Sequence, residues 1–171
     1  MKAAQNFNIL YVLLVICQIV LCNYCALGPY IMLSMLPAMI LCLPLKNSNI
    51  ICMLIAFASA LAVDWISEGV LGLNVAALLP VALTRKTIIR IFLGEDLINR
   101  SEMFTFRKNG VGKISATILT IYAIYLGVYV FLDGAGTRPL WFDLTRFGAS
   151  LAANWLLALL ITGILTPDDR K

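Results

Sequence analysis

The chain has 171 residues, of which 61% are hydrophobic and only 13% charged, and its formal net charge is +4. A soluble domain carries about 45–50% apolar and about 25% charged residues, so this apolar excess is too large for one globular core. The chain also lacks histidine, the most common metal ligand and the usual general base near neutral pH. Composition therefore excludes a water-soluble enzyme. It predicts a helical membrane protein without a catalytic site, a metal or a cofactor.

Apolar stretches along the chain predict six membrane-spanning helices, because about 20 apolar residues are needed per crossing and the alternation of a barrel strand is missing. The expected spans cover residues 9–27, 30–45, 50–66, 70–84, 114–132 and 147–166. The first is too long for the apolar region of a signal peptide, so we expect it to be retained. The predicted fold class is an all-α polytopic membrane protein, with one six-helix transmembrane bundle over residues 1–171.

The distribution of basic residues predicts the orientation of this bundle. With the N-terminus inside, the inner face receives 11 of the 13 basic residues, and the outer face receives only Arg138 and Arg146. This bias fits the positive-inside rule with an even number of spans. Both termini are therefore expected in the cytoplasm.

Residues 85–113 form the one long segment on the predicted inner side. It carries seven basic and three acidic residues, with apolar side chains between them, so we expect an amphipathic basic segment lying against anionic lipid. Two interpretations are compatible: a topology determinant on the membrane, or a docking surface for a cytoplasmic partner. Nucleic-acid binding is not favoured, because membrane insertion itself requires a basic inner loop.

A group of polar and small residues interrupts the apolar sequence between the third and fourth expected spans. It consists of Asp64, Ser67, Gly69, Gly72 and Asn74. An ionisable group inside a membrane usually has a partner or faces a cavity, and a short polar side chain can cap the next helix. The favoured interpretation is structural: Asp64, Ser67 and Asn74 tie the third helix to the fourth. The alternative is an ion or ligand site.

Further polar and small residues lie inside the first, third and sixth expected spans. Gln18 and Asn154 are each able to form hydrogen bonds between helices. Runs of small residues around Ala58 and Ala152 would let helices approach closely, either within the bundle or against a partner. The five cysteines are interpreted as apolar packing residues.

The pattern Asp64-x-x-Ser67-x-x-x-x-Gly72-Leu73-Asn74, with Gln18 in the first span and Leu43-Pro44-Leu45 at the end of the second, resembles the MreD family of bacterial rod-shape-determining proteins. The resemblance implies a multi-pass protein of the bacterial inner membrane, with a fold similar to the six-helix substrate-binding subunits of energy-coupling-factor transporters. It also implies a non-enzymatic scaffold of the cell-elongation complex that supports peptidoglycan synthesis.

The partners implied by this resemblance are an MreC-like single-span protein and, indirectly, RodA, a penicillin-binding transpeptidase and MreB. The transporter-like fold also supplies an alternative function, a small-molecule binding subunit of the vitamin-transporter type. Such a subunit needs a pocket with several convergent polar groups, whereas a scaffold needs small-residue helix faces, such as the run around Ala152.

Overall fold

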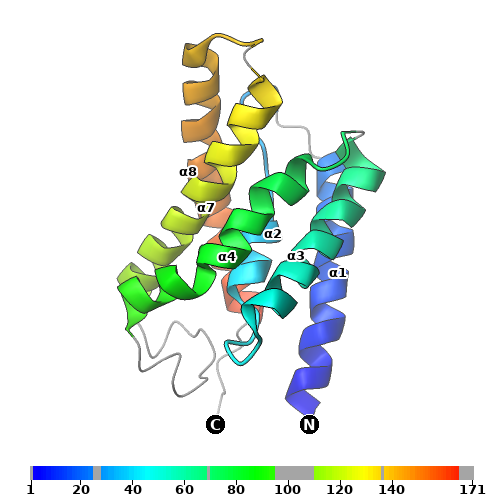
Figure 1. Ribbon diagram of the computed structural model, residues 1–171, viewed down its shortest axis with the longest axis vertical. Coiled ribbons are helices and arrows are strands. Elements are labelled where there is room, and N and C mark those ends of the chain that lie inside the picture. The colour runs from blue at the N-terminus through cyan, green and yellow to red at the C-terminus, as the bar shows by residue number, and fades with distance from the viewer. Residues whose placement is uncertain (1, 25–27, 69, 95–109, 136, 166–171) are drawn as a thin grey trace.

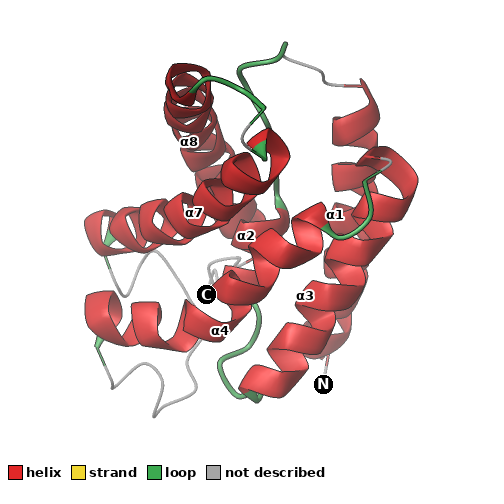
Figure 2. Cartoon of the chain, turned by 45° about the horizontal axis from the view of Figure 1, so that its top comes forward, coloured by secondary structure: helices red, strands yellow, loops and turns green. Residues whose placement is uncertain are grey.

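The computed structural model describes residues 2–24, 28–68, 70–94, 110–135 and 137–165 (Figure 1). Within these ranges the secondary structure is entirely helical, with no strand (Figure 2). The elements are α1 (Lys2–Tyr24), α2 (Leu36–Leu41), α3 (Asn49–Val63), the π-helical turn η1 (Asp64–Glu68), α4 (Leu73–Leu93), α7 (Val111–Gly134) and α8 (Leu140–Leu165).

Four segments in the described part are long and apolar enough to cross a membrane: Phe7–Tyr24, Asn49–Ser67, Val111–Gly134 and Leu140–Leu165. They correspond to the first, third, fifth and sixth expected spans. The prediction of an all-helical fold with membrane-spanning candidates is therefore confirmed for the described residues, whereas the other two expected spans are not among these four helices.

The expected span at residues 30–45 is wrong as a continuous helix. Residues 31–35 have no regular secondary structure, α2 has only six residues, and turns follow until α3 begins. Pro37 lies in the first turn of α2, where its missing N–H is tolerated. Pro44 follows the helix and cannot continue it. Two prolines seven residues apart thus leave room for less than two turns of helix.

The boundaries of the fourth expected span and of the basic inner segment are also corrected. Gly72 adopts a φ of 96°, and α4 begins only after it. The helix then continues to Leu93, so residues 85–93 belong to α4 and not to a separate segment that follows it. Arg85 is only 1% exposed, which contradicts its predicted position among lipid headgroups. Residues 95–109 of that segment, like Gly69, lie outside the described residues.

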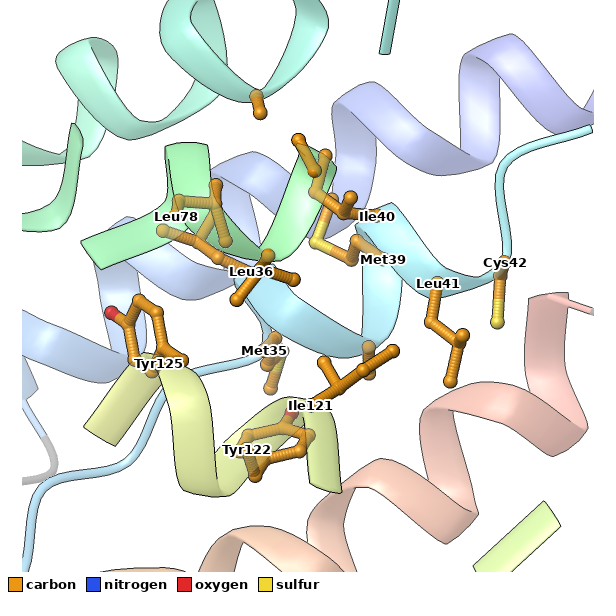
Figure 3. Close-up of a cluster of buried hydrophobic side chains, with 14 of the residues drawn as sticks. Met35, Leu36, Met39, Ile40, Leu41, Cys42, Leu78, Ile121, Tyr122 and Tyr125 are labelled. Carbon is orange, nitrogen blue, oxygen red and sulfur yellow. The ribbon is translucent and has the colours of Figure 1, made fainter. Parts of the chain in front are cut away.

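The short helix α2 lies at the centre of the bundle. All six of its residues are buried, and α4, α7 and α8 pack around it. Figure 3 shows Leu36, Met39 and Ile40 of α2 among Leu78 of α4 and Tyr125 of α7. The long helices run lengthwise around this centre, and α1 lies at one side (Figure 1). The core is therefore built around an element too short to cross the membrane itself.

Candidate functional site

The segment that leads into α2 has no regular secondary structure and enters the protein interior. We call residues 30–35 the clamped segment. Tyr30 is 52% exposed, whereas Ser34 and Met35 are buried. Inside a membrane, every backbone N–H and C=O needs a partner within the protein, and a segment without helical structure cannot supply its own. The partners therefore have to come from surrounding helices.

The α8 side of the clamped segment is held by two side chains. The Asn154 amide donates from Nδ2 to the Met32 carbonyl oxygen (2.6 Å) and accepts at Oδ1 from the Ser34 N–H (2.7 Å). The Ser150 hydroxyl oxygen accepts from the Met32 N–H (3.0 Å). Because Asn154 and Ser150 are one helical turn apart, both reach the same edge of the segment.

The opposite edge is held by Gln18 of α1. Its Nε2 donates to the Leu33 carbonyl oxygen (3.3 Å), and its Oε1 accepts from the Met35 N–H (2.7 Å). The Met32 backbone and the Ser34 N–H thus bind α8, whereas the Leu33 carbonyl and the Met35 N–H bind α1 on the opposite edge. Gln18 and Asn154 replace the two neighbouring strands that the segment lacks.

A third helix, α7, also binds the clamped segment. The Tyr122 hydroxyl donates to the Ser34 carbonyl oxygen (2.9 Å), and both residues are fully buried. The Ser34 hydroxyl oxygen, by contrast, is buried without a hydrogen-bond partner among the described residues. Six backbone groups between Met32 and Met35 therefore have side-chain partners, whereas the Ser34 hydroxyl has none among the described residues.

Arg85 holds the other end of α2. Its Nε donates to the Leu41 carbonyl oxygen (3.2 Å), its Nη2 donates to the Leu43 carbonyl oxygen, and its Nη1 lies 3.4 Å from the Cys52 sulfur. The last carbonyls of a helix have no partner within that helix, and a positive charge near them is favourable. The guanidinium therefore caps α2 from a neighbouring helix.

Sequence reasoning missed this role of Arg85, although a signal was present. The buried residues Leu78, Val81 and Ala82 of α4 are followed by Arg85, Ile88 and Ile89 at the same helical spacing. This helical spacing of buried residues continues beyond residue 84, where the expected span ended. It therefore indicates that Arg85 lies on the inward face of α4.

Asp64 joins α3 to α4. Its carboxylate accepts from the Gly72 N–H (2.9 Å), the Asn74 N–H (3.2 Å) and the Asn74 side-chain Nδ2 (2.7 Å). The first N–H groups of a helix are unpaired, and a carboxylate there is also favoured by the helix dipole. The Tyr125 hydroxyl donates to Asn74 Oδ1, which extends the network to α7. The Asp64 carboxylate thus links α3 to α4, and Asn74 links both to α7.

Two other predicted site residues that the structure describes, Ser67 and Ala152, have no hydrogen bond to these networks. Ser67 has a hydroxyl oxygen that is buried without a partner among the described residues, so it does not contribute to the α3–α4 connection. Ala152 lies on an exposed face of α8, whereas Ala56 and Ala60 of the α3 run are fully buried. The two runs of small residues therefore differ: the α3 run packs inside the bundle, and part of the α8 run faces outward.

Among the described residues, no group of three or more Cys, Asp or Glu side chains could hold a metal ion. No family model, no curated protein and no solved structure matches the chain. The resemblance to MreD-like proteins therefore stays a prediction, and function is inferred from the contacts within the bundle.

Proposed function

We propose that this protein is a non-enzymatic membrane scaffold of the bacterial cell-elongation complex, which binds an MreC-like single-span partner and supports rod shape and peptidoglycan synthesis. The observation that carries the proposal is the use of the buried polar groups. Gln18, Asn154, Arg85 and Asp64 all bind backbone groups of the chain itself. Such cross-links favour one fixed arrangement of helices, as a scaffold requires.

We infer that the scaffold crosses the inner membrane six times, with both termini in the cytoplasm. Four long helices account for four passes, and α4, with 21 residues or about 31 Å, is long enough for a fifth. The clamped segment and α2 together would make the sixth. Reporter fusions after Arg100 test this topology, and a periplasmic signal at that position would contradict it.

The partner surface that we propose is the outward face of α8 around Gly148 and Ala152, both exposed. A Cβ atom added to Gly148 would meet no atom of another described element within 4 Å, so no described part of the chain covers this position. Small residues let the backbone of a second helix approach closely. The single span of an MreC-like protein would pack here and connect the scaffold indirectly to RodA, the transpeptidase and MreB.

The α8 surface can be tested with one substitution and a matched control. Ala152→Leu adds bulk to the proposed interface, whereas Ala58→Leu adds the same bulk to an exposed position on α3. We expect rod-shaped cells that are depleted of this protein to become round. Ala58→Leu should restore their shape and co-purify with the MreC-like protein, whereas Ala152→Leu should do neither. Depleted cells that kept their outline would contradict the elongation role. Equal rescue by both variants would contradict the α8 surface.

Anionic lipid is the second proposed contact of the scaffold. Lys46, Arg90 and Lys113 are exposed, and they lie at the α2–α3 turn, near the end of α4 and near the start of α7. Clustered basic side chains at a membrane surface attract anionic headgroups. These residues support the predicted inner-face contact in place of Arg85, which is buried.

A second candidate function is a small-molecule binding subunit of a membrane transporter, of the vitamin-transporter type. It is favoured by the clamped segment, because interrupted membrane helices often mark substrate sites, and by the unpartnered Ser34 hydroxyl. The test is a thermal shift of purified protein with a vitamin panel. A shift that Ser34→Ala abolishes would favour this function. The absence of any shift or co-isolated ligand would count against it.

A further inference from the structure

An ion-pair cluster lies where α7 and α8 meet, at what we call the hairpin end of the bundle. Asp133 near the end of α7 accepts from Arg138 Nη1 (2.8 Å) and from Arg146 Nη1 of α8. A charged side chain at the membrane centre costs about 2.5–3.5 kcal/mol on insertion scales, and the cost falls toward the surface. Three charged residues in one cluster therefore place the hairpin end close to the membrane–water interface.

The inward side of the first turns of α8 is fixed by packing. The Arg138 guanidinium lies 5.6 Å from the centre of the Phe142 ring, and the Phe142 ring is 5.1 Å from the Tyr30 ring. This stack ties the start of α8 to the first residue of the clamped segment. The outward side chains of the same turns consequently have a defined direction.

Those outward side chains are large, apolar and uncovered: Leu140 is 86% exposed, Trp141 is 76% exposed and Leu144 is 63% exposed. Further along α8, the face continues through Leu156 to Ile164, both also exposed. From Leu140 to Ile164 the helix rises about 36 Å, and a typical tilt of about 20° leaves about 34 Å along the membrane normal. The hydrocarbon layer is about 30 Å thick, so one end of this face reaches the headgroup layer.

Exposed aromatic rings from other elements lie toward the same end of the bundle (Figure 1). Tyr24 ends α1, Trp65 lies in η1 and Phe131 lies in the last turn of α7, and these side chains are between 74% and 84% exposed. In Figure 1 the ends of α1 and η1 lie in the upper part of the bundle, to one side of the α7–α8 hairpin and below it. Tryptophan and tyrosine prefer the headgroup level of a membrane, because their rings are apolar and carry a polar group.

We propose that the hairpin end docks in the headgroup layer of one leaflet, through Leu140, Trp141 and Leu144 of α8 together with Trp65 of η1. The Asp133 ion-pair cluster lies at the level of the lipid phosphates. The partner of this surface is thus the lipid interface itself, and these contacts set the depth of the bundle in the membrane. The inference depends on membrane insertion and is independent of the proposed elongation role.

Tryptophan fluorescence tests this depth directly. Variants that keep only Trp65 or only Trp141, with the other tryptophans changed to Phe, are reconstituted in vesicles of phosphatidylcholine and phosphatidylglycerol. Brominated lipids carry the quencher either near the headgroup or near the end of the acyl chain. As the control, Leu156→Trp in a tryptophan-free background places an exposed ring about 22 Å along α8 from Trp141.

We expect the ratio of shallow to deep quenching to exceed one for Trp65 and Trp141 and to fall below one for the Leu156→Trp control. Circular dichroism checks that each variant retains its helical content. Quenching of Trp141 by aqueous acrylamide without quenching by either lipid would overturn the proposal, because the surface would then be open to a soluble partner. Deep quenching of Trp141, or shallow quenching of the control, would overturn it by placing α8 at another depth.

Discussion

The clamped segment can be tested by removing one of its two amide partners. Asn154→Leu keeps the approximate volume of the side chain and removes both its donor and its acceptor. The Ser34 N–H and the Met32 carbonyl oxygen then lose their partners on α8. Both groups lie where α7, α8 and α1 surround the segment, so water cannot easily replace the amide.

Two limits bracket the expected loss of stability. A buried polar group left without a partner costs about 1–3 kcal/mol, so two of them give an upper range of about 2–6 kcal/mol. Side-chain hydrogen bonds inside membrane proteins average only about 0.6 kcal/mol, which sets a lower limit near 1.2 kcal/mol for two bonds. We expect a decrease in the free energy of unfolding of about 2–3 kcal/mol, because the bonds are short and both partners belong to the backbone.

Reversible unfolding in mixed micelles, with sodium dodecyl sulfate as denaturant and circular dichroism as the signal, measures this free energy. Ala152→Leu is the control, because it changes an outward position of the same helix and should leave stability within about 0.5 kcal/mol. The double variant with Gln18→Leu tests whether both amides hold one segment. Its loss should fall short of the sum of the single losses by about 0.5 kcal/mol or more. An Asn154→Leu protein as stable as the control, or strict additivity, would refute the clamp.

Three further predictions concern the other buried groups, and the same unfolding measurement checks each. Arg85→Lys should lower stability by about 1–3 kcal/mol, because a single ammonium cannot reproduce the planar fork that binds two carbonyls; an unchanged value would contradict the capping role. Gly72→Ala should lower stability by about 1–2 kcal/mol, because φ is 96° there. The control Gly127→Ala, at an open position inside α7, should raise stability by about 0.5–1 kcal/mol. Equal effects of the two substitutions would argue against the left-handed turn at Gly72. Tyr125→Phe should cost about 1 kcal/mol through the lost bond to Asn74, and a neutral result would remove α7 from the Asp64 network.

The long helices were predictable because their signal is local. A continuous apolar stretch near 20 residues long indicates a membrane helix whatever surrounds it, and α1, α3, α7 and α8 were found in this way. The polar residues within apolar stretches were equally visible. A side chain such as Gln18 or Asn154 needs a partner at that depth, and the sequence therefore predicts that it binds something inside the protein.

The clamped segment could not be predicted by the same reasoning, because its stability comes from distant residues. Asn154 follows Ser34 by 120 residues, and Tyr122 follows it by 88. Hydropathy reports how well side chains tolerate lipid, and it does not show whether the backbone between them is helical. Pro37 and Pro44 were the local signs that a full helix was impossible.

The buried position of Arg85 was obscured by a general rule about charge. Basic residues cluster on the cytoplasmic side, so the first arginine after an apolar run appears to mark the end of a membrane span. In this chain the helix continues for two more turns, and the arginine lies beside the carbonyls at the end of α2. The rule describes the average position of a charge, whereas the free carbonyls of a short buried helix determine this one.

The two faces of α8 connect the interior of the bundle with its proposed partner surface. Ser150 and Asn154 face inward and hold the clamped segment, whereas Gly148 and Ala152 face outward on the same two turns. A helix is stiff over this length, so a partner that displaced α8 at Ala152 would also displace the amide of Asn154. Partner binding and the order of the clamped segment would then be linked, and the linkage would act in both directions. Asn154→Leu should consequently weaken partner binding without touching the interface, whereas Ala152→Leu should weaken it without loosening the clamp.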